Sequence, residues 1–96
     1  MFYVYILYSP QYDKYYIGHT DDLERRLLEH NEISDKSYTS KFRPWKLAAK
    51  FPIGDDRGLA MKVERHIKNQ KSKTYLKVTI DRGNIDEVIK RYSSDG

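Results

Sequence analysis

Five side chains in this sequence carry groups that enzymes use for proton transfer and anion binding. They are two phenols, a guanidinium and an imidazole four residues apart, and a carboxylate: Tyr5, Tyr16, Arg26, His30 and Glu64. A carboxylate can hold a divalent metal ion, and a planar guanidinium can bind two oxygens of one phosphate. An imidazole, with an unperturbed pKa of about 6.5, exchanges protons at neutral pH, whereas a phenol, at about 10, needs a nearby positive charge.

Each of these residues also has an ordinary structural explanation. Paired tyrosines are common cross-strand contacts in β-hairpins. At helical spacing Arg26 can pair with Asp22, and Glu64 can pair with Lys68. His30 could simply complement the dipole at the C-terminal end of a helix. From the residues alone, these alternatives stay open.

Length and composition narrow the possible classes of protein. With 96 residues, we expect a single domain over residues 1–92 and a disordered tail over 93–96. The net charge of +4 suits a polyanionic partner without requiring one. The lack of cysteine excludes disulfides, zinc–thiolate sites and thiol nucleophiles. The apolar run at residues 2–8 is too short to span a membrane, so we expect a soluble, cytoplasmic protein with no membrane partner.

The N-terminal segment has the pattern of a β-hairpin. Residues 2–8 are apolar or aromatic throughout, which predicts a central strand, and residues 13–18 form a second strand after a turn at 9–12. A four-residue loop there would place Tyr5 opposite Tyr16 and Tyr3 opposite Gly18. A five-residue loop would put Tyr5 and Tyr16 on different faces.

The next segment is predicted to be a helix that begins at Thr20 and runs to about Asn31. Thr20 can cap its free amides, and two aspartates follow in the first turn. Helical periodicity places three leucines on the buried face, Arg26 and His30 at its border, and Arg25 away from it; the leucines are Leu23, Leu27 and Leu28.

The rest of the chain predicts a loop, one strand and three helices. The loop covers 32–40, the third strand 45–51 and the first helix 57–70. The segment from Ser72 onward favours a helix over a strand, and Asn84 caps a short closing helix. The expected fold is therefore α+β, with a three-stranded antiparallel sheet flanked by helices.

Taken together and in order, these motifs resemble the GIY-YIG nuclease family. Tyr3-Val4-Tyr5 stands at the first motif, with tyrosine in place of glycine, and Tyr16-Ile17-Gly18 is the second motif intact. The segment YYIGHTDDLERRLLEHN resembles the strand-to-helix junction of the family, and FRPWKL resembles the third-strand entry. The match is closest to small stand-alone bacterial members, which are related to UvrC-type repair nucleases and homing endonucleases.

The resemblance implies a role for each candidate. A metal-dependent nuclease of this family would use Glu64 to hold Mg²⁺ or Mn²⁺, Arg26 to bind phosphate and Tyr5 as a candidate base, with Tyr16 and His30 orienting it or relaying its proton. Which of these three is the base stays open. His19 is a further candidate by position only, and we expect its side chain to be exposed to solvent.

Basic residues outside these motifs are predicted to bind the nucleic-acid backbone without reading its sequence. They are Lys14, Lys36, Lys41, Arg43, Lys46, Lys68, Lys71 and Lys73. DNA is expected rather than RNA, with cutting in repair or recombination, and specificity would be weak or would come from a partner protein. The alternative is a nucleic-acid-binding module on the same fold that does not cut.

Overall fold

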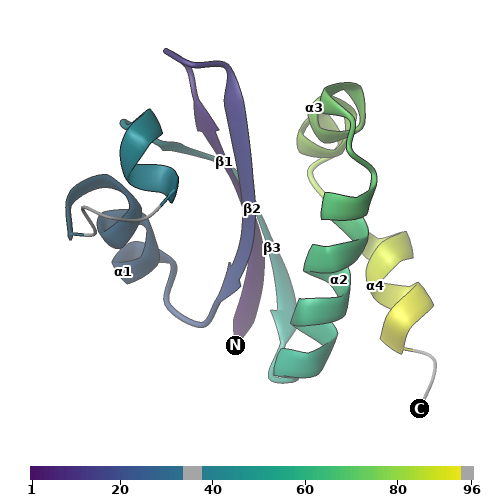
Figure 1. Cartoon of the computed structure of the whole chain (residues 1–96). Helices are drawn as coiled ribbons and strands as arrows, with labels where there is room; N and C mark the ends of the chain where they lie inside the picture. The colour runs from purple at the N-terminus through teal and green to yellow at the C-terminus, as the bar shows by residue number, and fades with distance from the viewer. Residues whose placement is uncertain (34–37, 94–96) are drawn as a thin grey trace.

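The computed structural model describes residues 1–33 and 38–93 of the chain (Figure 1). Its three strands are β1 (Phe2–Ser9), β2 (Lys14–Thr20) and β3 (Lys46–Gly54). Its α-helices are α1 (Leu23–Leu28), α2 (Arg57–Asn69), α3 (Lys73–Arg82) and α4 (Asp86–Ser93). A π-helical turn, η1 (Glu29–Ile33), and a 3₁₀ turn, η2 (Tyr38–Phe42), lie between α1 and β3. The predicted α+β fold is confirmed.

The sheet has the strand order β2-β1-β3, and β1 pairs with both neighbours antiparallel. A central strand needs apolar side chains on both faces, and β1 is buried from Val4 to Leu7. The prediction that this segment is the central strand is therefore confirmed. β2 lies at an edge of the sheet, which matters for the site described below.

The hairpin register differs from the predicted pairing by two residues. Tyr5 lies opposite Gly18, and Tyr8 lies opposite Tyr15. The loop does have four residues, 10–13, but it starts one residue later than expected, because Asp13 has a positive φ of 51° and cannot continue a strand. Since a shift of two preserves the side-chain alternation, Tyr5 and Tyr16 still share a face.

Helices cover both faces of the sheet (Figure 1). On one face, α2 packs its apolar stripe of Ala60, Val63 and Ile67 against a core that includes Val4, Ile6, Ile17 and Phe51. On the other, α1 and the turns η1 and η2 lie over a smaller, more aromatic cluster. That cluster consists of Tyr5, Leu7 and Trp45, with Tyr16, Leu23, Leu27 and Phe42 packed against it.

The helix expected from Thr20 to Asn31 is shorter and less regular than predicted. Its N-cap is Asp22, whose side chain accepts a hydrogen bond from the Arg25 backbone, and not Thr20. After Leu28 the chain continues as the wider π turn of η1, which moves the following side chains around the axis. Leu28, the last residue of α1, is exposed and does not belong to the buried face.

The remaining elements agree with the sequence patterns. β3 extends the strand predicted over 45–51, and α2 ends one residue before the predicted 57–70. The segment after Ser72 is helical, with Ser72 as its N-cap and Gly83 ending it at a φ of 77°. Asn84 accepts a hydrogen bond from the Asp86 backbone at the start of α4, as expected.

Two predicted segments, the loop over 32–40 and the tail over 93–96, lie partly outside the described residues. The turns η1 and η2 occupy both ends of the loop predicted over 32–40, while residues 34–37 lie outside the described part. Of the predicted tail, residues 94–96 also lie outside it, so the tail stays a prediction. In the described ranges, no helix combines the length and apolar character needed to cross a bilayer.

Candidate active site

Tyr5 and His30 form a buried hydrogen-bonded pair beneath α1. Tyr5 Oη lies 3.0 Å from Nε2 of His30, and Nδ1 of the same ring lies 2.9 Å from Oγ1 of Thr39. The π turn η1 places His30 over the sheet, and η2 supplies Thr39. A neutral imidazole has one N–H donor and one acceptor nitrogen, so it links the two hydroxyls in a single hydrogen-bonded chain.

Burial keeps both members of this pair uncharged at neutral pH. It raises the pKa of Tyr5 to about 12, although hydrogen bonding to Arg26 opposes the shift. It also lowers the pKa of His30 to about 4, and the positive charge of Arg26 acts in the same direction. The free protein therefore holds a phenol next to a neutral imidazole.

Gly18 provides the space that the Tyr5 hydroxyl occupies. A Cβ atom built at Gly18 would lie 2.5 Å from Tyr5 Oη and 2.7 Å from Cζ, closer than side chains pack. The glycine of the second motif is thus required for space opposite Tyr5. The predicted pairing of Tyr3 with Gly18 is wrong, because Tyr3 pairs with Thr20.

Tyr16 lies next to the same pair. Its ring centroid is 4.8 Å from that of His30 and 6.4 Å from that of Tyr5. The indole of Trp45 packs edge-on against it, at 6.3 Å. Tyr16 is half-buried, and its ring lies between the Tyr5–His30 pair and the surface.

Arg26 approaches the Tyr5 hydroxyl from α1. Hydrogen bonding to Tyr5 is the main cause that raises the pKa of Arg26, so the guanidinium stays positively charged. Its Nη1 lies 3.7 Å from Oε1 of Glu29, and no pair with Asp22 forms, because Asp22 caps the helix. Its Nε is buried without a hydrogen-bond partner among the described residues, which is uncommon for a buried donor.

Glu64 lies on α2, on the other side of β2, and both of its oxygens are occupied. Oε1 is 2.7 Å from Nδ1 of His19, and Oε2 is 2.7 Å from Nζ of Lys68. The pair with Lys68 is the helical pair considered as the ordinary explanation of Glu64. His19 is only 19% exposed, so the expectation that it faces solvent is wrong.

The contact between His19 and Glu64 was not predicted from the sequence. Alternation along β2 turns Tyr16 and Gly18 toward α1, and turns Ile17 and His19 toward α2. The contact of His19 could have been anticipated from strand alternation, which places His19 on the opposite face from Gly18. That is the face that a later amphipathic helix covers.

The residues on the α1 face of the sheet and those on the α2 face approach each other around the outer edge of β2. Nζ of Lys68 lies 5.9 Å from the ring centroid of Tyr16, while the same ammonium binds Glu64. The charge of Glu64 is also close enough to contribute to the raised pKa of Tyr5. The five residues selected from the sequence thus lie around one edge strand. Tyr5 is hydrogen-bonded to His30, Tyr16 packs beside both rings, Arg26 interacts with Tyr5, and Glu64 is joined to Tyr16 through Lys68.

Glu64 is the carboxylate of the candidate site that was predicted to hold a divalent ion. Among the described residues, no group of three or more His, Cys, Asp or Glu side chains could hold a metal. A single carboxylate nevertheless suits Mg²⁺, which keeps most of its waters and takes further oxygens from a substrate phosphate. Glu64 fits such an ion if the ammonium of Lys68, which is 46% exposed, moves away.

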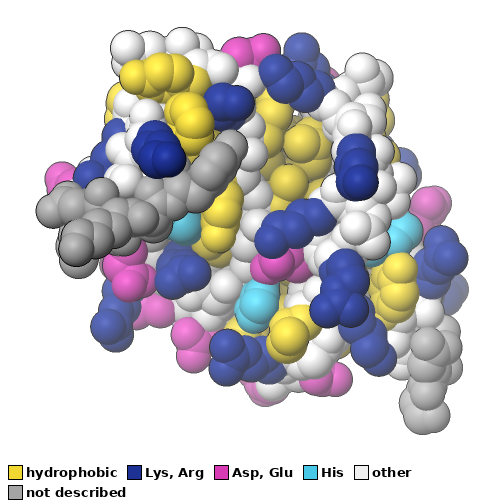
Figure 2. All heavy atoms as spheres, in the orientation of Figure 1, with side chains coloured by type: hydrophobic (Ala, Val, Ile, Leu, Met, Phe, Trp, Pro, Cys, Tyr) yellow, Lys and Arg dark blue, Asp and Glu magenta, His cyan; other side chains and the backbone are white. Residues whose placement is uncertain are grey.

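Four predicted phosphate-binding lysines surround a hollow between β2 and the α2–α3 junction. This cavity of about 280 Å³ is lined by Lys14, Lys68, Lys71 and Lys73, together with apolar side chains such as Ile17 and Leu76. Figure 2 shows hydrophobic side chains in the hollow between the strands and these helices, with Lys and Arg side chains around it. The lysines therefore lie beside the candidate site.

The other predicted phosphate-binding residues occupy different environments. Lys41 and Lys46 are exposed, at the end of η2 and the start of β3. Arg43 donates from Nε to the carbonyl of His30 at 2.7 Å and from Nη2 to that of Glu29 at 3.4 Å, so it also fixes η1 in place. Lys36 lies outside the described residues.

The comparison with known families agrees with these motifs. Residues 1–77 match the GIY-YIG catalytic domain, a span that contains all five candidate catalytic residues. The chain belongs to the GIY-YIG family. GIY-YIG domains are generally nucleases, which implies nucleic-acid binding, and they typically depend on divalent metal ions. No curated protein and no solved structure matches the chain significantly.

Proposed function

We propose that this GIY-YIG domain is an endonuclease that uses Mg²⁺ or Mn²⁺ to hydrolyse phosphodiester bonds in DNA. The observation that carries the proposal is the arrangement around β2, with the Tyr5–His30 hydrogen bond and Arg26 on one side and Glu64 on the other. The likeness to repair and homing nucleases supports DNA over RNA, and a role in repair or recombination. Specificity from a partner protein belongs to the same proposal.

Arg26 would bind the phosphate that is cleaved. Its guanidinium stays charged, and its contact with Tyr5 places it beside the group that would activate water. Two parallel N–H donors match two phosphate oxygens and would neutralise the charge that develops as water attacks. The packing of Leu23 and Leu27 in the aromatic cluster fixes α1, and with it the base of the Arg26 side chain.

Tyr5 and His30 would remove the proton from the attacking water. Arg26 has only N–H donors, so in its interaction with Tyr5 the phenolic Oη would accept and would keep its own hydrogen to donate to Nε2 of His30. As water attacks phosphorus, its proton passes to Tyr5 Oη while the phenolic proton passes to Nε2. Phosphate bound to Arg26 offsets the charge that lowers the pKa of His30, so substrate makes the imidazole a better acceptor.

Glu64 would hold the metal ion, and His19 would hold Glu64. When bound, the ion supplies positive charge that stabilises the leaving oxygen. The 2.7 Å contact between His19 Nδ1 and Oε1 orients the carboxylate so that Oε2 faces the Tyr16 side of β2. Lys68 would then be free to bind a neighbouring phosphate.

A plasmid-nicking assay with matched arginine variants tests this function. The wild-type protein should nick supercoiled DNA when Mg²⁺ or Mn²⁺ is present, and Arg26→Ala or Glu64→Gln should lower the rate on the order of 100-fold while DNA binding remains. Arg25→Ala is the control, because it removes the same charge from the adjacent, exposed position.

The competing function is a module that binds nucleic acid without cutting it. The ammonium of Lys68 on Glu64 favours this alternative, since it fills the position that the metal would take. Wild-type protein that binds plasmid, branched and single-stranded DNA, but cuts none of them with either metal, would establish the binding module and overturn the nuclease.

A further inference from the structure

A pair of aromatic rings, one exposed and one half-buried, lies at the tip of the β1–β2 hairpin. Tyr12 lies in the hairpin loop and is 45% exposed, although it is a large aromatic side chain. Its ring meets that of Phe42 edge-on, with centroids 5.4 Å apart and an interplanar angle of 74°. The ammonium of Lys14 lies 5.0 Å from the Phe42 centroid. Tyr12, Phe42 and Lys14 are called the aromatic platform below.

The aromatic platform lies on the same side of the sheet as the candidate catalytic residues. Phe42 packs against the cluster that contains Tyr5 and Trp45, with Tyr16 beside it. Lys14 precedes Tyr16 by two residues on β2, so the two share a face of the strand and their Cα atoms are separated by roughly 7 Å. A nucleotide next to the cleaved phosphate could therefore reach the platform.

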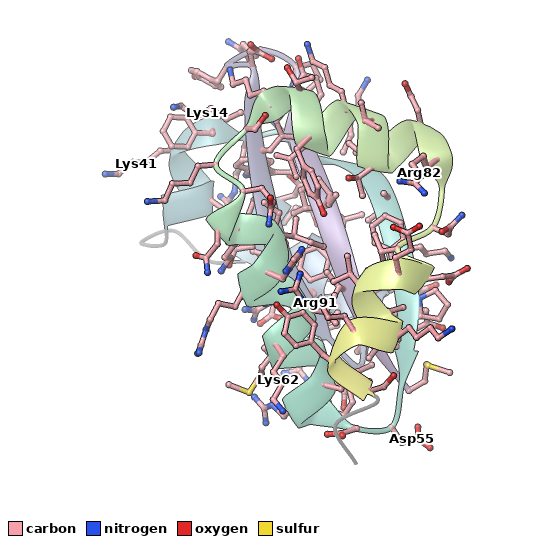
Figure 3. All side chains as sticks on the ribbon, turned by 90° about the vertical axis from the view of Figure 1, so that its right-hand side faces the viewer. Lys14, Lys41, Asp55, Lys62, Arg82 and Arg91 are labelled. Carbon is pink, nitrogen blue, oxygen red and sulfur yellow. The ribbon has the colours of Figure 1, made fainter. Side chains whose placement is uncertain are left out.

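Positive charges flank the aromatic platform. Lys41 is exposed and adjoins Phe42 in η2, and Figure 3 shows Lys14 and Lys41 at the same edge of the molecule, away from Arg82 and Arg91. Lys73 reaches the hairpin loop from α3, with Nζ 2.9 Å from Oδ2 of Asp13. An exposed aromatic ring bordered by lysines is a combination that binds single-stranded nucleic acids, because the ring stacks on a base while ammonium groups contact phosphates.

We infer that the aromatic platform stacks an unpaired base of the substrate strand, and that the protein prefers nucleic acids with a single-stranded segment over a continuous duplex. In a duplex, bases are stacked on one another and cannot cover the Tyr12 ring. The inference rests on the proposed function, since it names the kind of substrate that the site takes. An overhang, a flap or a fully single-stranded segment would meet its requirement.

Binding of oligonucleotides that contain 2-aminopurine, measured in EDTA to prevent cutting, tests the inference. We expect the wild-type protein to bind a single strand more tightly than a blunt duplex of the same length and to change the fluorescence of the stacked base. Tyr12→Ala should weaken single-strand binding about 5-fold or more and abolish that change. Tyr12→Trp should retain both, because an aromatic ring is restored.

A matched control separates stacking from general surface effects. Met61, on α2, has the same exposed fraction as Tyr12, 45%, and its neighbour Lys62 lies at the far end of the molecule from Lys14 in Figure 3. Met61→Ala should leave binding to both oligonucleotides unchanged. Melting temperatures of the variants check that each is folded.

The outcomes distinguish this inference from the nuclease proposal. If Tyr12→Ala weakens neither substrate, or weakens single strand and duplex equally, the stacking inference is overturned, whether or not the wild-type protein nicks plasmid. If the loss is confined to single strands and restored by Tyr12→Trp, the inference holds. In that case, absence of nicking by the wild-type protein would overturn only the catalytic part of the proposed function.

Discussion

The hydroxyl of Tyr5 depends on three neighbours, each through a different property. Nε2 of His30, 3.0 Å away, bonds to it, Arg26 keeps its pKa from rising further, and Gly18 leaves it room. Burial, which would ordinarily disable a phenol as a base, here also keeps the accepting imidazole neutral. The chemistry of the site is thus set by contacts of single atoms.

Replacing Gly18 tests the need for space at this hydroxyl. In Gly18→Ala the new methyl group would meet Tyr5 Oη at 2.5 Å, and the buried ring cannot move away without repacking its cluster. We expect a loss of about 1–3 kcal/mol in the free energy of unfolding, measured by urea denaturation, together with a lower nicking rate. Wild-type stability and wild-type nicking in this variant would contradict the close contact.

His30 makes the stability of the protein depend on pH. Its folded-state pKa of about 4 lies below the ordinary value of 6.5, so between these values the unfolded chain binds a proton that the folded chain does not. The free energy of unfolding should therefore fall as pH drops from 6.5 to 4, by about 3 kcal/mol at most. Denaturation curves across this range should show the fall, and His30→Gln should reduce it; an identical slope in both proteins would contradict the buried, neutral imidazole.

At the scale of elements, the site is made by one edge strand and the two layers that cover it. β2 turns Tyr16 toward α1 and His19 toward α2, so helices on opposite faces contribute to one site.

Local patterns predicted most of the helices and strands, because apolar spacing and caps such as Ser72 act over a few residues. They missed the hairpin register, which depends on the positive φ of Asp13 and its hydrogen bond from Tyr8. They also missed the exposure of Leu28 at the end of α1.

The Lys68–Glu64 pair on α2 gives a prediction about metal binding. The ammonium of Lys68 occupies Oε2 of Glu64 and therefore competes with a metal ion for this oxygen. The Lys68→Met variant lacks this competitor, so it should bind Mn²⁺ about 2- to 5-fold more tightly than the wild-type protein, as measured by electron paramagnetic resonance. Lys62→Met is the control, since Lys62 lies on the same helix and is exposed. Unchanged or weaker Mn²⁺ affinity in Lys68→Met would argue that the ion binds elsewhere.

At the scale of the whole molecule, the proposal depends on residues almost sixty positions apart acting on one phosphate. The motifs around Tyr5, Tyr16 and Arg26 predicted the family, but no local pattern shows that Glu64 lies beside them, because that depends on how α2 packs on the sheet. The same packing places His19 against Glu64 and could not be predicted from β2 alone. Tertiary contacts, and not spacing along the chain, bring the site together.

Single-turnover nicking by Arg26→Lys, Glu64→Asp and the double variant tests this claim most directly. Groups that act together on one phosphate lose their effect together, so the double variant should be only slightly slower than the slower single variant. Two losses that multiply in the double variant would contradict the account, because they would mean that Arg26 and Glu64 act independently.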